Sequence, residues 1–271
     1  MTESKKYVLG QSERAARRLQ IQDAHFGDTS EQLLDDLALR PGDRVVDLGC
    51  GPGGFSRRIL RRLGPQGVLV GVDYTNGLLT QAAAGLADNR FQPVLADVAK
   101  LGPWLNGADV VVGRAMLHHI PMVELMLGRL RAALPKGVRV GFIEPDFRSP
   151  LARLAYQETA RPELLAPLRF WAIAINNLYL ANRLSPDVGA SLARTLETAG
   201  FQRVRAGWSE CRSDNLMIEN RIMFYEEVHD QLQSLGILTA QEIEEQCNRL
   251  RALSPNSLPA AWGIHRVACE T

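Results

Sequence analysis

The chain has 271 residues, of which 46% are hydrophobic and 23% charged, and its formal net charge is +1. This length and composition are typical of a globular protein that buries a substantial core. A charge so close to zero argues against a protein built mainly to coat nucleic acid or an anionic membrane.

Cysteine usage and hydropathy suggest a cytoplasmic protein. The four cysteines, at positions 50, 211, 247 and 269, are scattered and lack metal-ligand or redox-pair spacing, so we expect reduced thiols and no metal site. The first residues are polar, no signal-like apolar segment follows, and no apolar run is long enough to span a bilayer. We therefore expect no membrane partner.

The first elements in chain order alternate between helices and strands. Residues 11–39 are predicted to be helical, and the Arg-Pro-Gly-Asp run at 40–43 ends that segment. Strands are then predicted at 44–48, 68–72, 91–95, 109–112 and 138–143, with helices at 55–63, 78–86 and 121–134. This alternation predicts an α/β, Rossmann-like fold with a mostly parallel sheet and helices on both faces.

The second half departs from this alternation. Helices rich in large apolar residues are expected within 148–184, then a helix at 186–199, a strand at 201–206, helices within 216–253 and a last strand at 262–269. We interpret residues 1–271 as a single domain. Its parts are a helical cap at 1–40, a cofactor-binding core at 41–147, a helical lid insertion at 148–184 and a C-terminal part at 185–271.

A glycine run, residues 49–54, joins the first strand to its helix. Glycines permit a tight turn and close approach of a ligand, and the helix start offers free N–H groups. A glycine run alone is weak evidence for a particular ligand, because many nucleotide-binding folds use one. Asp47 strengthens it, since a carboxylate inside the strand suits a positively charged ligand. Asp73 ends the second strand, where an acid can accept hydrogen bonds from a ribose diol, and Asp97 follows the third, where it can accept one from an adenine amino group.

These features resemble class I S-adenosylmethionine-dependent methyltransferases, in particular the small-molecule group that includes ubiquinone- and menaquinone-type enzymes. The resemblance covers roughly residues 40–146 and includes Leu117-His118-His119 and Leu134-Pro135-Lys136-Gly137. It implies a seven-stranded sheet whose last strand is antiparallel, and S-adenosylmethionine as cofactor with S-adenosylhomocysteine as product. Carried over, the cofactor-binding residues are Asp47, Gly49, Gly51, Asp73 and Asp97. Further candidates are Tyr7, Gln22, Cys50, Gly53, Tyr74, Val98 and Arg114.

Candidate catalytic residues follow the fourth and fifth strands. His118 and His119 come after the fourth strand, and histidine is the natural general base near neutral pH. Of the two we assign the catalytic role to His119, although either ring can equally cap a helix or pack. Glu144, at the end of the fifth strand, can accept a proton or hold a substrate. Trp171, Asn176 and Tyr179 are candidate substrate-binding residues in an apolar helical segment, which can equally be a buried core helix or a dimer seam.

The sequence thus predicts an enzyme that methylates a small-molecule acceptor, apolar or aromatic, without a nucleic-acid partner; a homodimer stays open. One alternative is a cyclase or pericyclase that binds S-adenosylmethionine without transferring its methyl group. An RNA or protein methyltransferase is disfavoured because residues 113–116 lack an Asn/Asp-Pro-Pro-Tyr-type motif. A nicotinamide dehydrogenase is disfavoured by Asp47. The arginines at 57, 58, 61 and 62 are expected to form a solvated helix face without interleaved aromatics.

Overall fold

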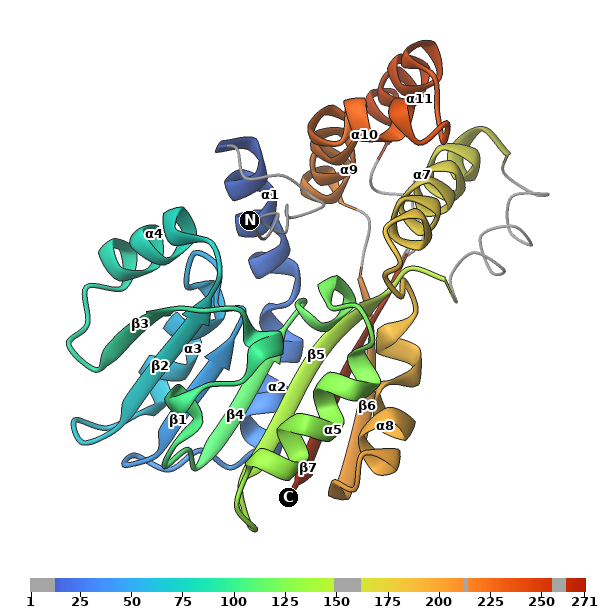
Figure 1. Cartoon of the computed structure of the whole chain (residues 1–271). Helices are drawn as coiled ribbons and strands as arrows, with labels where there is room; N and C mark the ends of the chain where they lie inside the picture. Colours follow the sequence, from blue (N-terminus) through green and yellow to red (C-terminus); the bar gives the residue numbers. More distant parts are fainter. Residues whose placement is uncertain (1–12, 149–161, 212–213, 255–261) are drawn as a thin grey trace, which may run out of the picture. The chain divides into compact units, whose positions relative to one another are not determined.

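A computed structural model describes residues 13–148, 162–211, 214–254 and 262–271, drawn in Figure 1. Seven strands form one sheet in the order β3-β2-β1-β4-β5-β7-β6. Their bounds are β1 Arg44–Leu48, β2 Val68–Asp73, β3 Phe91–Leu95, β4 Val110–Arg114, β5 Arg139–Asp146, β6 Gln202–Cys211 and β7 Trp262–Glu270. The sequence prediction of a Rossmann-like, seven-stranded α/β fold is confirmed.

The direction of the strands follows from their pairing. β1 pairs in parallel with β2 and β4, β2 with β3, and β4 with β5. β7 runs in the direction opposite to β5. Thr271 donates its N–H to the Val138 carbonyl (3.1 Å), and the Cys269 thiol donates to the Val140 carbonyl (3.6 Å). Residue numbers fall along β7 as they rise along β5. The last strand is therefore antiparallel, as the family resemblance implies.

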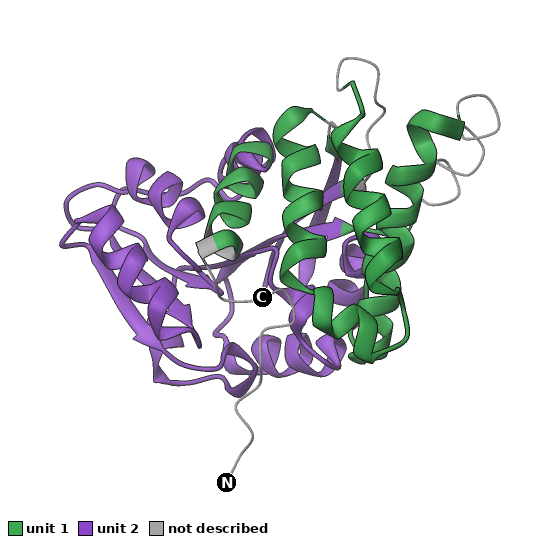
Figure 2. Cartoon of the chain, turned by 90° about the horizontal axis from the view of Figure 1, so that it is seen from above, with its two compact units in different colours: residues 1–25, 146–187, 210–263 green, residues 26–145, 188–209, 264–271 purple. Residues whose placement is uncertain are grey.

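The chain contacts divide into two compact units, coloured in Figure 2. The first comprises residues 1–25, 146–187 and 210–263, and the second comprises 26–145, 188–209 and 264–271. The expectation that the whole chain acts as one domain stays a prediction.

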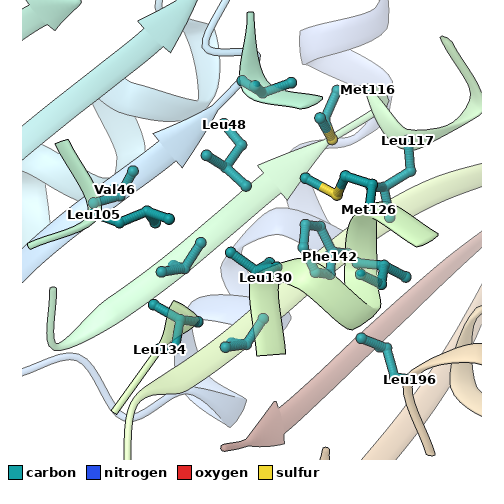
Figure 3. Close-up of a cluster of buried hydrophobic side chains, with 14 of the residues drawn as sticks. Val46, Leu48, Leu105, Met116, Leu117, Met126, Leu130, Leu134, Phe142 and Leu196 are labelled. Carbon is teal, nitrogen blue, oxygen red and sulfur yellow. The ribbon is translucent and has the colours of Figure 1, made fainter. Parts of the chain in front are cut away.

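The second unit contains most of the sheet and five α-helices among its described residues. These are α2 Gly27–Asp36, α3 Gly54–Arg62, α4 Asn76–Leu86, α5 Val123–Ala133 and α8 Val188–Thr198, with the 3-10 turns η1 Val98–Lys100, η2 Pro103–Leu105 and η3 Leu117–His119. Successive β5 residues face opposite sides of the sheet. A Cβ on Gly141 would lie 2.9 Å from Leu33 of α2, whereas Phe142 packs with Met126 and Leu130 of α5, as Figure 3 shows.

The first unit is helical. Its helices are α1 Glu13–His25, α7 Pro162–Ala181, α9 Asn215–Glu227, α10 His229–Ser234 and α11 Ala240–Arg251. Helix α7 is long and apolar enough to span a bilayer by length and composition alone, but 56% of that window is buried inside the molecule. Burial of this kind is typical of a core helix, and the Trp171 side chain on α7 packs edge-on against Phe147 and Phe224.

Some predicted boundaries were wrong. The helix expected over 11–39 is interrupted at Phe26, where α2 begins at Gly27, and a Cβ at Gly27 would come within 3.1 Å of the Arg58 guanidinium on α3. β5 continues to Asp146 and β6 to Cys211, beyond the predicted ends. Of the proposed lid at 148–184, residues 149–161 lie outside the described residues, and the rest contains α7.

Candidate functional site

Strand register brings the chemistry-bearing residues to one edge of the sheet. Leu48 of β1 is level with Val72 of β2 and with Gly113 of β4. The next residues, Gly49 just after β1 and the last residues of β2 and β4, Asp73 and Arg114, therefore lie at the same level of the sheet. Ligands of open α/β sheets bind at this carboxyl edge.

The glycine loop follows β1 and turns sharply. Gly49, Gly51 and Gly53 have φ of 66°, 53° and 86°, which side chains rarely adopt. An added Cβ at Gly49 would lie 2.8 Å from the Met116 Cβ, and one at Gly53 would lie 3.2 Å from the Ala82 Cβ. At Gly51, apart from its two chain neighbours, no atom of the described residues lies within 4 Å of that position. Gly51 is thus the one of these three glycines at which a ligand can approach the backbone directly.

Asp73 closes this loop from the end of β2. It is 7% exposed, and its two oxygens accept the N–H groups of Gly51 (3.0 Å) and Thr75 (2.8 Å). Burial raises the pKa of Asp73, and the hydrogen bonds from these backbone groups oppose that rise. Both carboxylate oxygens are hydrogen-bond acceptors, which is the chemistry that the hydroxyls of a diol require.

Asp47 is buried within β1 and accepts a hydrogen bond from the Ser56 hydroxyl of α3 (2.6 Å). Burial raises the pKa of Asp47 to about 7, while Ser56 and the nearby positive charge of Arg114 act to lower it. The neighbouring thiol of Cys50 is also buried, and burial raises its pKa well above the ordinary value. Cys50 therefore has the character of a packing residue rather than a nucleophile.

Arg114 lies between two aromatic rings at the end of β4. Its guanidinium carbon is 5.2 Å from the centroid of Phe55 and 5.7 Å from that of Phe26, and Nη1 donates to the Ser30 hydroxyl (3.1 Å). Stacking and hydrogen bonding restrict the guanidinium, which gives the carboxyl edge a fixed positive charge close to Asp47.

The remaining cofactor candidates occupy varied environments. Asp97 is half-buried and accepts the Ala99 N–H (3.0 Å) at the start of η1, whereas Val98 is part of the hydrophobic core. Tyr74, next to Asp73, is 40% exposed. Gln22 is half-buried on α1 in the first unit, and Tyr7 lies outside the described residues.

The three catalytic candidates lie together after β4 and at the end of β5. Glu144 is fully buried, and its Oε2 is 2.6 Å from Nδ1 of His118. The ring of His118 is 3% exposed, and its centroid is 4.1 Å from that of the half-buried His119. The sequence prediction did not foresee that Glu144 would be bonded directly to one of the two histidines.

The substrate-binding candidates lie in the interior of the first unit. Trp171 and Tyr179 are buried, with ring centroids 6.0 and 5.8 Å from that of Phe147. Asn176 donates to the carbonyls of Phe147 and Ala172 at 2.8 Å each, and the adjacent Asn177 is exposed. Their proposed contact with an acceptor stays a prediction.

Sequence reasoning missed several residues that shape the site. Ser56, Phe55 and Phe26 were not assigned a role beside Asp47 and Arg114, although a hydroxyl and an aromatic side chain directly after a glycine loop are usable signals. Two arginines of the basic helix α3 form ion pairs with an acid of α2, because Arg58 and Arg62 both bind Glu31. Among the described residues, no group of three or more His, Cys, Asp and Glu is placed to hold a metal ion.

Strand order, the glycine loop and the acids at the carboxyl edge define a Rossmann-like protein of the nucleotide-binding type. Residues 18–206 match the family described as "Methyltransferase domain", and the chain belongs to that family.

Curated relatives are methyltransferases as well. The chain is 33% identical over 140 residues to trans-aconitate 2-methyltransferase of Variovorax paradoxus, covering 51% of this chain and 53% of that protein. It is 27% identical over 204 residues to aklanonic acid methyltransferase DauC of a Streptomyces species, covering 69% and 87%. The chain thus spans about half the length of the trans-aconitate methyltransferase it matches.

Among solved structures, the [4+2]-cyclase SpnF has the same fold. It matches with a TM-score of 0.55 and 16% identity over 90% of this chain and 80% of its own.

Proposed function

We propose that this protein transfers a methyl group from S-adenosylmethionine to a small-molecule acceptor and releases S-adenosylhomocysteine. The single observation that carries this proposal is the open space at Gly51 beside the buried carboxylate of Asp73. An open position in a glycine loop, next to a carboxylate at the end of the second strand, fits an adenosine ligand. Family membership supports the same conclusion.

Each end of the cofactor has a chemically matched group on the carboxyl edge. Asp73 would hold the ribose hydroxyls, and Asp97 the adenine amino group. The methionine end would lie along Gly49 to Gly53, with its ammonium group toward Asp47 and its carboxylate toward Arg114. A restricted guanidinium and a buried carboxylate within electrostatic reach of each other suit a zwitterion.

The cofactor supplies an already activated methyl group, so the chain contributes mainly by positioning and by excluding water. The backbone of the glycine loop would position the methyl donor. The loop after β4 carries the side chains that could accept a proton from the acceptor. His118 and His119 are the titratable side chains of that loop. Their role arises for an acceptor that must lose a proton when it is methylated.

The acceptor we propose is a small apolar or aromatic molecule, and the two relatives, named for trans-aconitate and aklanonic acid, place organic acids in the set to be tested. We propose no nucleic-acid partner, since arginines of α3 are paired with acids of α2. We also propose that the protein is soluble and cytoplasmic; of helix α7, which has the length and composition to cross a bilayer, 56% of the apolar window is buried inside the molecule.

The test is formation of S-adenosylhomocysteine from S-adenosylmethionine with a panel of small carboxylic acids, phenols and quinols, using RNA and a protein mixture as controls. Acceptor-dependent product with a small molecule supports the proposal. Product only with RNA or protein overturns the acceptor class. Cofactor binding without any product would instead favour a cyclase-type activity on this fold.

A further inference from the structure

We propose that Glu144 is a positioning residue that fixes the loop after β4 and holds His118 in the tautomer whose Nε2 accepts the acceptor's proton. The inference rests on the proposed methyltransferase function and deepens it by selecting His118 over His119. It also limits the acceptor to one that is methylated at an O–H or N–H group.

Glu144 receives four hydrogen bonds from three consecutive residues. Oε1 accepts the N–H groups of Met116 (2.9 Å) and Leu117 (2.8 Å). Oε2 lies 3.4 Å from the N–H of His118 and 2.6 Å from its ring Nδ1. The carboxylate is completely buried, so its interactions are not shared with bulk water. One side chain of β5 therefore determines the path of the chain leaving β4.

This arrangement specifies the histidine tautomer. Three backbone N–H groups can only donate, so both oxygens of Glu144 already act as acceptors. A hydrogen bond between Oε2 and the His118 ring then requires a proton on Nδ1. In neutral imidazole the other nitrogen, Nε2, carries the lone pair, and a carboxylate partner stabilises the cation formed when Nε2 takes a proton.

The loop held by Glu144 also touches the cofactor loop. Met116 packs so closely on Gly49 that a Cβ there would lie 2.8 Å from the Met116 Cβ. The backbone of Glu144 is packed closely against α8, because a Cβ on Gly189 would lie 2.7 Å from the Glu144 carbonyl oxygen. Glu144 is thus fixed on its backbone side and connects the general-base candidate to the loop that receives the donor.

The surroundings of the ring favour a base at this position. The His119 ring lies beside it, with the two ring planes tilted by 45°. Helix α8 also contacts η3, and the buried face of α8 is apolar. The charged residues of α8, Arg194 and Glu197, are exposed. In the transfer step, the O–H or N–H proton moves to Nε2, the released electron pair forms the bond to the methyl carbon, and the S–C bonding pair returns to sulfur.

Nitrogen-15 NMR of histidine-labelled protein tests the tautomer directly, without an acceptor. The chain has five histidines, and the signals of His118 are assigned by their loss in His118→Asn. In the wild type we expect Nδ1 to be protonated and Nε2 unprotonated at pH 8. In Glu144→Gln the amide nitrogen can donate to Nδ1, so the proton should move to Nε2. A wild-type ring protonated on Nε2, or an unchanged tautomer in Glu144→Gln, would overturn the proposal.

Kinetics with a phenol or quinol acceptor from the panel, which must lose a proton on methylation, test the role of the base. His118→Asn keeps a donor toward Glu144 but removes the base, and general-base catalysis is typically worth about 10²–10⁴ in rate. We expect kcat to fall at least ~10-fold while the KM for S-adenosylmethionine changes less than about threefold. His119→Asn should lower kcat less than His118→Asn does, and the control His229→Asn, on α10 and outside the site, should keep kcat. Full kcat in His118→Asn overturns the inference even if methylation is real, whereas failure of the wild type to methylate anything counts against the proposed function.

Discussion

Asp73 and Gly51 are 22 residues apart in the chain, yet the carboxylate of one accepts the N–H of the other at 3.0 Å. The hydrogen bond joins the end of β2 to the middle of the glycine loop. Of the three loop glycines with positive φ, Gly51 is the one whose Cβ position has no atom of the described residues within 4 Å, apart from its chain neighbours. The same carboxylate thus shapes the loop and remains available to a ligand.

Replacing Asp73 with alanine should weaken the binding of S-adenosylhomocysteine by roughly tenfold or more, because charge-assisted hydrogen bonds contribute about 1.5–3 kcal/mol each. Isothermal titration calorimetry measures this. Asp109→Ala is the control. Asp109 directly precedes β4 and accepts the backbone N–H of Arg44 at the start of β1, at the end of the strands opposite the carboxyl edge. An unchanged dissociation constant in Asp73→Ala would remove Asp73 from the cofactor site.

Gly51→Ala and Gly53→Ala form a matched pair. Both force a side chain into a positive φ, at a cost of about 1–2 kcal/mol. At Gly53 the methyl group also meets Ala82 and Leu86, so the main loss should be in stability, measured by urea unfolding. At Gly51 the methyl group occupies the ligand's approach, so affinity for S-adenosylhomocysteine should fall roughly tenfold or more. Equal affinities in the two variants would contradict this account.

Asp47 predicts a pH dependence of stability. Its pKa of about 7 in the folded protein lies above the ordinary value of 3.8, so the folded state retains the proton longer than the unfolded state. Ionisation of Asp47 therefore lowers the free energy of unfolding as pH rises from about 4 to about 7, and it causes no further change above pH 7. Asp47→Asn should therefore be more stable than the wild type at pH 8, by on the order of a few kcal/mol, and the difference should vanish near pH 4.

Urea unfolding at several pH values checks this, together with the control Asp43→Asn. Asp43 is also buried, but it is ion-paired with Arg139 at 2.7 Å, so loss of its charge should destabilise the protein. If Asp47→Asn were less stable than the wild type at pH 8, Asp47 would be stabilised as a carboxylate by its surroundings. The affinity of the Asp47→Asn variant for S-adenosylhomocysteine should also be reduced, since the ammonium group of the ligand loses its carboxylate partner.

Trp171→Ala distinguishes a core residue from an acceptor contact. The indole is 3% exposed and packs on Phe147, Phe224 and the Arg221 guanidinium, so we expect a loss of about 3–5 kcal/mol in unfolding free energy. Leu180→Ala on the same helix, 59% exposed, should change it by less than about 0.5 kcal/mol. Retained stability with a raised acceptor KM would instead place Trp171 at the acceptor site.

Local patterns were sufficient for the first five strands and for the acids that follow them. A buried strand, a glycine turn and an amphipathic helix are each encoded within a few residues, and parallel pairing then brings Asp47, Asp73 and Asp97 to one edge. The β5 prediction stopped early because Glu144 and Pro145 read as the end of a strand. Glu144 is buried there because its partners lie 26 to 28 residues earlier in the chain.

Long-range packing explains what the sequence could not show. Arg114 acquires its restricted position from Phe26 and Ser30, and the Arg114–Ser30 hydrogen bond spans 84 residues. For Trp171 and Asn176, an apolar helix with embedded amides has the same sequence pattern whether it lines a pocket or a core. The choice depends on partners such as the Phe147 carbonyl, which lies 29 residues away from Asn176.

The central claim is that the carboxyl edge above Gly49 to Gly53 binds S-adenosylmethionine, and calorimetry on the wild-type protein tests it most directly. Titration with S-adenosylhomocysteine should give one site per chain, with a dissociation constant within the range of about 1 μM–1 mM usual for enzyme ligands. NAD should bind more weakly or give no heat. Absence of binding at millimolar S-adenosylhomocysteine, or tighter binding of NAD, would contradict the account.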